Sequence, residues 1–118
     1  MSITLTLPYP PSVNHSHWHT RSGARVLKPA ARAFYEEVAA IAHNAGVEPI
    51  VGKVALTMHI YSAAVNEDAS NRIKLLEDAL QGFAYENDKQ VSEIHVYKHD
   101  AEKPKRKNAR VEVEVKAA

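Results

Sequence analysis

The chain has 118 residues, of which 45% are hydrophobic and 25% charged, and its formal net charge is +1. This length and composition suit one globular domain and are too small for two. The absence of cysteine excludes disulfides and thiolate metal sites and suits a reducing compartment. The first residues lack a signal-peptide pattern and no segment holds the roughly 20 apolar residues of a membrane span, so we expect a cytoplasmic protein.

The N-terminal half predicts one strand and one helix separated by a loop. The segment ITLTL at 3–7 alternates apolar and polar residues, as a strand with one buried face does, and PYPP ends it. Residues 12–29 show no period and predict a long loop. Apolar residues then recur at helical spacing from 31 to 45, and Gly46 stands where a helix C-terminus is expected.

The C-terminal half predicts a strand, a helix and two further strands. KVALTMHIYS at 53–62 has a period of two, and helical spacing returns at 73–83. QVSEIHVYK at 90–98 has apolar residues on both faces, which predicts a central strand. ARVEVEVK at 109–116 alternates cleanly, and the basic segment 99–109 predicts the hairpin loop or flap before it.

These elements predict a single α+β domain over residues 1–118 with the order β-α-β-α-β-β. A four-stranded mixed sheet with both helices packed on one face is the natural way to bury their apolar surfaces.

Charge is distributed unevenly along the chain. Residues 14–35 carry four basic side chains and no acid, residues 66–88 carry six acids and two bases, and residues 98–110 carry six bases and two acids. Clustered carboxylates suit a metal ion, and flanking basic segments suit a nucleic-acid backbone. Runs of charge also occur on solvated surfaces that have no function, and charge alone does not decide between these interpretations.

The segment DASNRIK at 68–74 places polar residues at the start of the second predicted helix. There Ser70, Lys74 and Asp78 share one helix face, and Asp88 precedes the next strand. If Asp68 and Asp88 converge, they suit Mg²⁺, which takes one or two carboxylates and substrate phosphate oxygens. Otherwise the first polar residues cap the helix, and Lys74 and Asp78 form an exposed ion pair.

Four segments in the same order resemble one known family: LPYPPSVN at 7–14, DASNRIK at 68–74, DAL at 78–80 and ENDKQV at 86–91. The chain resembles the RusA-type Holliday junction resolvases, which are small endodeoxyribonucleases often carried by prophages. The resemblance implies a metal carboxylate at Asp68, a catalytic lysine at Lys74 and a late carboxylate at Asp88. It departs from the family where Ser70 replaces a second metal-site aspartate and Asn87 replaces an acid.

The resemblance implies a homodimer that resolves four-way junctions in recombination and repair by paired phosphodiester hydrolysis, with Mg²⁺ as cofactor and Mn²⁺ as a substitute. Because Ser70 is a weaker ligand than aspartate, a catalytically impaired junction-binding relative is the alternative. The implied catalytic residues are Asp68, Ser70, Asn71, Lys74 and Asp88, and the implied metal ligands among them are Asp68, Ser70 and Asp88. The expected DNA contacts are Asn14, Lys28, Arg32, Lys103, Lys105, Arg106 and Lys107.

Overall fold

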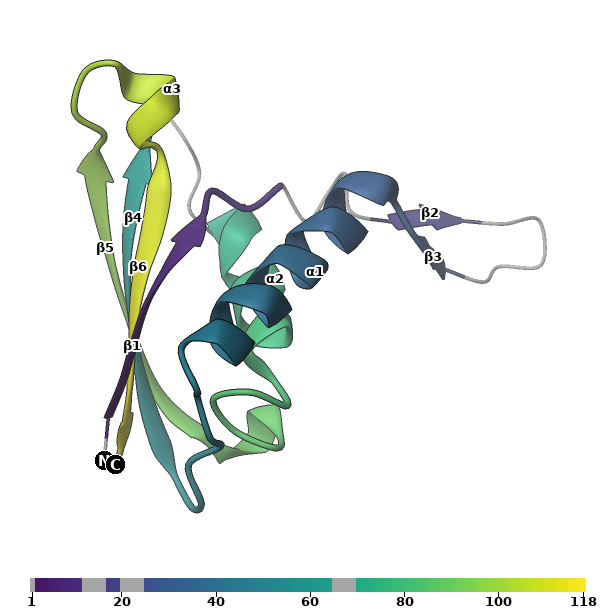
Figure 1. Cartoon of the computed structure of the whole chain (residues 1–118), viewed down its shortest axis with the longest axis vertical. Coiled ribbons are helices and arrows are strands. Elements are labelled where there is room, and N and C mark those ends of the chain that lie inside the picture. Colours follow the sequence, from purple (N-terminus) through teal and green to yellow (C-terminus); the bar gives the residue numbers. More distant parts are fainter. Residues whose placement is uncertain (1, 12–16, 20–24, 65–69) are drawn as a thin grey trace.

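The structure is a computed structural model that describes residues 2–11, 17–19, 25–64 and 70–118 (Figure 1). The elements, in chain order, are β1 (Ser2–Pro8), β2 (His17–His19), β3 (Arg25–Leu27), α1 (Pro29–Asn44), β4 (Val54–Ser62), α2 (Ser70–Leu80), η2 (Asp88–Gln90), β5 (Val91–Asp100), α3 (Lys105–Asn108) and β6 (Arg110–Ala117). No helix in this described part of the chain is long and apolar enough to cross a membrane.

Four strands form one mixed sheet in the order β1-β6-β4-β5. Strand β6 pairs antiparallel with β1 and β4, whereas β4 and β5 run parallel. Helices α1 and α2 lie on the same side of this sheet (Figure 1). The predicted α+β fold, with its β-α-β-α-β-β order of main elements, is therefore confirmed.

The core lies between this sheet and the two helices. Strands β1, β4 and β6 bury every second residue, as their period of two predicts. Helix α1 buries the stripe that begins at Ala31 and Phe34, and α2 buries Leu76 and Leu80. No helix of the described residues covers the opposite face of the sheet (Figure 1), so the central strands need only one apolar face.

Two details of the predicted fold were wrong. Residues 12–29 are not one loop, because β2 and β3 within them pair as a short antiparallel ribbon (Figure 1). The segment 99–109 is not one loop either, because β5 continues to Asp100 and Lys105–Asn108 forms α3. Periodicity could not reveal elements of three or four residues, which are too short to show a repeat.

The prediction that 90–98 forms a central strand was also wrong, because β5 is an edge strand. Its residues alternate between the helix side, where Ile94 and Val96 lie beside Leu56 and Met58, and the open side. The sequence suggested two buried faces because Tyr97 is a large apolar residue, but Tyr97 lies on the open side of the sheet and is 50% exposed. The central positions belong to β4 and β6.

We expect Leu76→Ala to lower the free energy of unfolding by about 2–5 kcal/mol, because it leaves a cavity at a fully buried position on α2. Val51→Ala is the matched control, since that side chain is 94% exposed and its loss should change stability by no more than about 0.5 kcal/mol. Urea denaturation followed by circular dichroism measures both. Equal effects of the two substitutions would contradict the assignment of α2 to the core.

Candidate active site

One lysine on α2 lies between two carboxylates that come from different elements. Its Nζ is 3.1 Å from Asp78 Oδ1 and 3.6 Å from Asp88 Oδ2. Asp78 follows Lys74 by one helical turn, which accounts for the first contact. Asp88 begins η2, so the second contact joins two segments that the sequence separates. We call Lys74, Asp78 and Asp88 the charged cluster.

The segment between α2 and η2 turns back on the helix and so brings Asp88 to it. Gly82 supplies a positive φ of 90°, and its N–H donates to the Tyr85 carbonyl at 2.7 Å. Tyr85 is fully buried, and its hydroxyl donates to the Glu77 carbonyl at 2.8 Å. The Ile50 N–H donates to the Ala84 carbonyl at 2.9 Å, which holds the turn on the α1–β4 connection.

Asn87 and Gln90 then fix η2 itself. The Asn87 Oδ1 accepts from the Lys89 N–H at 2.9 Å, and Gln90 Oε1 accepts from the Asn87 N–H at 3.0 Å. The Gln90 Nε2 donates to the carbonyls of Ile50 and Gly52, each at 2.8 Å. Asn87, where the family pattern has an acid, therefore serves as the cap of η2.

Electrostatic interactions keep the lysine in its ammonium form. The hydrogen bond and charge of Asp78 raise the pKa of Lys74, and the charges of Asp88 and Glu77 add to this effect. Burial raises the pKa of Glu77, and the Lys74 charge opposes that shift. Burial, followed by the Asp78 charge, raises the pKa of Tyr35 on α1.

Glu77 and Tyr35 are the neighbours of the charged cluster that sequence reasoning did not place in the site. The electrostatic interaction of Glu77 with Lys74 and Asp88 supports its presence near the cluster. The charges of Asp78 and Lys74 both act on the pKa of Tyr35, which supports a position of this α1 residue near the cluster. The sequence signal was weak: Tyr35 belongs to the apolar stripe of α1, which gives no indication of a neighbouring charge.

The charged cluster is open to solvent. The side chains of Lys74, Asp78 and Asp88 are 58%, 38% and 36% exposed. A phosphate group can therefore reach the lysine without any movement of the core, and a hard cation can reach the carboxylates.

The predicted metal ligands are placed only in part. Asp68 lies outside the described residues, and Ser70 and Asn71 begin α2. Within the described part of the chain, no three side chains of His, Cys, Asp or Glu form a group that could hold a metal ion. Asp88 and Asp78 offer hard oxygen atoms of the kind that Mg²⁺ binds, and Mg²⁺ needs only one or two carboxylates. Oxygen donors of this kind are chemically suited to Mg²⁺.

The proline-rich segment after β1 contacts the start of α2. The Arg72 guanidinium lies 5.0 Å from the Tyr9 ring centroid, and its Nη1 donates to the Pro10 carbonyl at 2.8 Å. The Tyr9 hydroxyl lies 3.4 Å from Ser62 Oγ at the end of β4. Two of the four motif segments, LPYPPSVN and DASNRIK, therefore meet in space.

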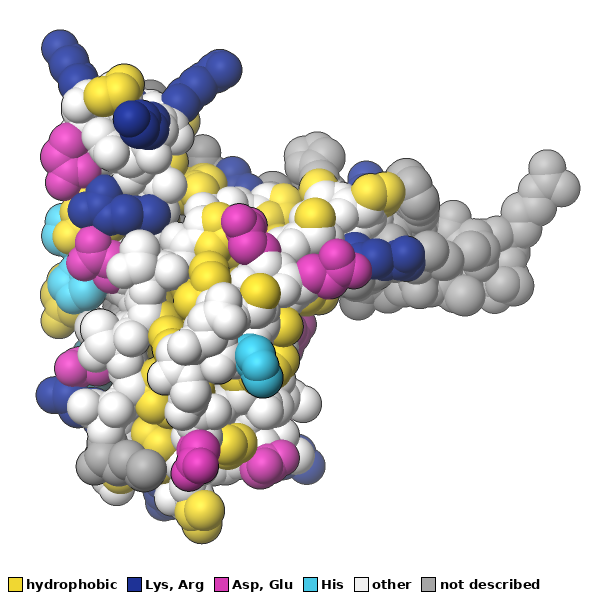
Figure 2. Space-filling model, viewed as in Figure 1, with side chains coloured by type: hydrophobic (Ala, Val, Ile, Leu, Met, Phe, Trp, Pro, Cys, Tyr) yellow, Lys and Arg dark blue, Asp and Glu magenta, His cyan; other side chains and the backbone are white. Residues whose placement is uncertain are grey.

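The predicted DNA contacts fall into two groups. Lys28 and Arg32 lie at the start of α1, whereas Lys103, Lys105, Arg106 and Lys107 surround α3, and Asn14 lies outside the described residues. Basic side chains project from the α3 end of the molecule (Figure 2). We call residues 103–107 the basic tip.

Arg110 fastens the base of the basic tip to the sheet. Its Nη1 donates to Glu102 Oε2 and its Nε to Glu112 Oε2, both at 2.9 Å. Its guanidinium also lies 3.9 Å from the Tyr61 ring centroid. The hydrogen bond from Arg110 lowers the pKa of Glu102. The tip is thus tied to the rigid part of the fold.

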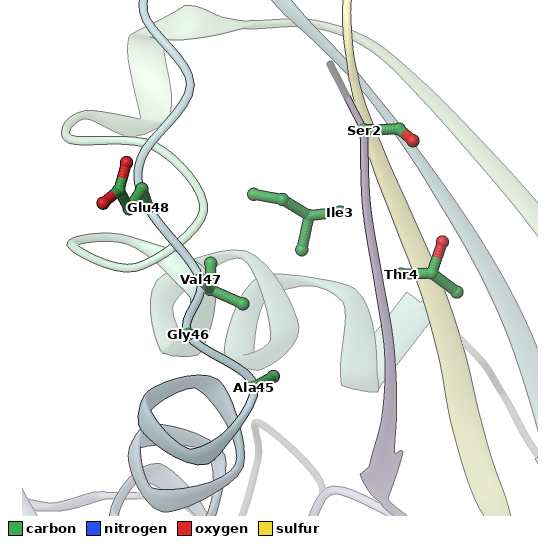
Figure 3. A pocket seen from close by; sticks show the side chains of 7 residues that line it. All are labelled: Ser2, Ile3, Thr4, Ala45, Gly46, Val47 and Glu48. Carbon is green, nitrogen blue, oxygen red and sulfur yellow. The ribbon is translucent and has the colours of Figure 1, made fainter.

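Two cavities lie apart from the charged cluster. One of about 290 Å³ separates the proline-rich segment from α1, where Tyr9 and Phe34 line it. The other, also about 290 Å³, lies between β1 and the α1–β4 connection, and there Ile3 and Val47 point toward one another (Figure 3). Lys74 and Asp88 line neither cavity. The candidate site is therefore the solvent-exposed charged cluster and not a closed pocket.

Comparison with known proteins agrees with this arrangement. No curated protein matches the chain. A family model described as endodeoxyribonuclease RusA matches residues 8–116, which include the proline-rich segment, α2, η2 and the basic tip. The chain therefore belongs to the RusA family of endodeoxyribonucleases.

Proposed function

We propose that this protein is a magnesium-dependent, structure-selective endodeoxyribonuclease that resolves four-way DNA junctions as a homodimer. The observation that carries the proposal is the 3.6 Å contact between Lys74 and Asp88. The resemblance to the family implies a catalytic lysine at Lys74 and a late carboxylate at Asp88. These two side chains meet on an open surface of a chain from an endodeoxyribonuclease family.

In this proposal, Asp88, Asp68 and Ser70 hold the ion. When bound, Mg²⁺ would polarise the scissile phosphate and activate a water for attack. Lys74 stabilises the negative charge that develops on the phosphoryl oxygens, and its raised pKa keeps it cationic at neutral pH. Asp78 holds the ammonium group in place from one turn along the helix. Asn71, in the first turn of α2, completes the proposed polar set.

The basic side chains supply affinity for the junction. Lys28 and Arg32 on α1, together with the basic tip, are proposed to contact phosphates, which provides binding without sequence information. A four-way junction has two-fold symmetry, and paired cuts need two equivalent sites, which a symmetric dimer provides.

The alternative is a junction-binding relative with impaired cleavage. Two positions favour it: Ser70 has a hydroxyl where the family has a metal-binding carboxylate, and Asn87 is used as a cap for η2. A neutral hydroxyl binds Mg²⁺ more weakly than a carboxylate. This alternative retains junction binding and forms no cleavage products.

We expect Lys74→Met and Asp88→Asn each to reduce the cleavage rate of a labelled four-way junction by about 100-fold or more. Lys74→Met removes the positive charge that stabilises the transition state, and Asp88→Asn removes a carboxylate of the proposed metal site. Junction binding in a gel-shift assay should remain within about threefold of the unchanged protein, since phosphate contacts dominate affinity. Chelation of Mg²⁺ should have the same effect as Asp88→Asn. Lys53→Met and Glu36→Gln, which alter exposed side chains elsewhere, are the matched controls. Full cleavage by Lys74→Met would refute the assignment.

Ser70→Asp separates the proposal from its alternative. If the native site is impaired, restoring a carboxylate should raise the cleavage rate by about tenfold or more and lower the Mg²⁺ concentration needed for half-maximal activity. If Ser70 suffices, both quantities should stay within about twofold. Titrations with Mg²⁺ and Mn²⁺ measure them. A gain in rate identifies the impaired relative.

The basic tip should set the salt dependence of binding. We expect Arg106→Ala with Lys107→Ala to reduce the slope of log K against log salt by about 0.9 for each phosphate that the variant no longer neutralises. Lys53→Ala with Lys116→Ala removes the same charge from other exposed positions and should leave the slope unchanged. Equal changes of the slope in the two double variants would mean that net charge, and not the basic tip, governs the salt dependence of binding.

A further inference from the structure

The face of the sheet away from α1 and α2 carries two pairs of stacked rings. Even-numbered residues of β4 are buried toward the helices, so odd-numbered residues of β4 and their partners on β5 lie on the other face, which we call the open face. The Tyr61 and His99 ring centroids are 4.6 Å apart, and those of His59 and Tyr97 are 4.9 Å apart. The ring planes are inclined by only 17° and 14° within the pairs. We call these four rings the ring platform.

A hydrogen bond ties the two pairs of rings together. His59 Nδ1 and His99 Nε2 are 2.9 Å apart, and their ring centroids are 5.1 Å apart. The two nitrogens therefore point at one another, and one imidazole donates its N–H to the other. On the far side of Tyr61, the Arg110 guanidinium lies 3.9 Å from the ring centroid. The ring platform is thus preorganised, so a ligand that stacks on it loses little free energy in ordering these side chains.

Tyr97 is the most exposed ring of the platform. Its side chain is 50% exposed, and one face of its ring lies against His59. Among the described residues, no second ring and no cation lies against Tyr97, and its hydroxyl has no hydrogen-bond partner. A large aromatic ring with one free face can take a further planar group into the same stack. The open end of the platform is therefore a place for a planar ligand.

The basic tip lies at the end of the open face, beside the ring platform. Its connection to β6 ends at Asn108, whose carbonyl accepts from Arg110 Nη1 at 2.8 Å, and this same Arg110 covers the Tyr61 ring. Residues 103–107 contain four basic side chains and no acid. Figure 2 shows histidine side chains along the molecule just below the basic side chains that project from this end. Positive charge and stacked rings thus form one continuous surface.

The acids of the open face each lie beside a basic group, which reduces the repulsion that a polyanion meets there. The pairs are Glu112 with Arg110 at 2.9 Å, Glu114 with Lys116 at 3.5 Å and Glu93 with His95 at 3.6 Å. The basic tip has no acid among its own residues to offset its charge. The electrostatic character of this end of the face is therefore set by the tip.

We propose that the ring platform and the basic tip together bind single-stranded DNA. An unpaired base stacks on the free face of Tyr97, and the phosphates that follow it run past His99 to the basic tip. Surfaces that bind single strands combine these two components, because aromatic rings stack on any base and basic side chains follow the backbone. A duplex cannot use the platform, since its bases are already stacked on one another. The partner is DNA because the chain belongs to an endodeoxyribonuclease family.

This surface is separate from the proposed cleavage site. The charged cluster belongs to α2 and η2, and α2 lies on the other side of the sheet (Figure 1). A single strand on the open face therefore leaves Lys74 and Asp88 accessible. The open face would bring the protein to DNA that exposes unpaired bases, which goes beyond the cleavage reaction itself.

Three substitutions at one exposed position test the stacking contact. The probe is a labelled oligothymidylate of about 12 nucleotides, and fluorescence anisotropy in the presence of a metal chelator measures its Kd. We expect Tyr97→Ala and Tyr97→Leu each to raise the Kd by about tenfold, because neither side chain offers an aromatic face. Tyr97→Phe keeps the ring and should stay within about twofold of the unchanged protein. Val51→Ala, which removes exposed apolar surface elsewhere, is the matched control.

Two further measurements separate stacking from charge. Tyr97→Ala should leave the slope of log K against log salt unchanged, because the phosphate contacts remain. On an abasic strand of the same length, which has the phosphates but no bases, Tyr97→Ala should bind as tightly as the unchanged protein. An equal loss of affinity on the abasic strand would overturn the stacking contact.

Three other outcomes would also overturn the inference. They are unchanged binding of oligothymidylate by Tyr97→Ala, tighter binding of an RNA strand than of DNA, and an effect of Tyr97→Ala on oligomeric state in light scattering without any effect on DNA binding. The last result would assign the open face to a protein contact. Because these assays contain no metal and measure no cleavage, their failure is distinguishable from failure of the nuclease proposal.

Discussion

The return of the chain after α2 is the constraint on which the candidate site depends. Buried Tyr85 anchors the turn to the helix through the Glu77 carbonyl, and Gln90 anchors η2 to the α1–β4 connection. The ion pairs of Lys74 are about half exposed, and exposed pairs of this kind contribute little to stability. Packing therefore brings the charges together, and the charges do not hold the turn. Lys74 and Asp88 come within ion-pair distance because the packing of buried Tyr85 places η2 beside α2.

Much of the fold could be predicted from the sequence, because burial leaves a period. Val111, Val113 and Val115 identify β6 as strongly as any pattern can, and the stripe of α1 is equally regular. The order of the strands could not be predicted in full. Tyr97 and the apolar residues beside it suggested a strand buried on both faces, but α1 and α2 lie on one side of the sheet (Figure 1). Periodicity reports which residues are apolar and does not report which face is covered.

The candidate site was predictable to a smaller extent. Helix geometry alone places Asp78 beside Lys74, and the structure has that pair. The approach of Asp88 depended on the positive φ of Gly82 and on the burial of Tyr85, neither of which has a distinct sequence signal. The capping role of Asn87 could not be predicted either. In the sequence, the replacement of an acid by Asn87 suggests only a weakened metal site, whereas the structure shows that Asn87 caps η2. The position of Asp68 lies outside the described residues.

The parallel pairing of β4 with β5 has a consequence for dynamics. Parallel neighbours require a crossover connection, and here that connection contains α2, the turn and η2. Lys74 and Asp88 thus both belong to this one crossover connection, whose two ends are fixed by β4 and β5. Local unfolding of the crossover would separate all three side chains of the charged cluster together, while the antiparallel strands stayed paired. The integrity of the charged cluster therefore depends on the opening free energy of this one segment, which native-state hydrogen exchange at α2 measures.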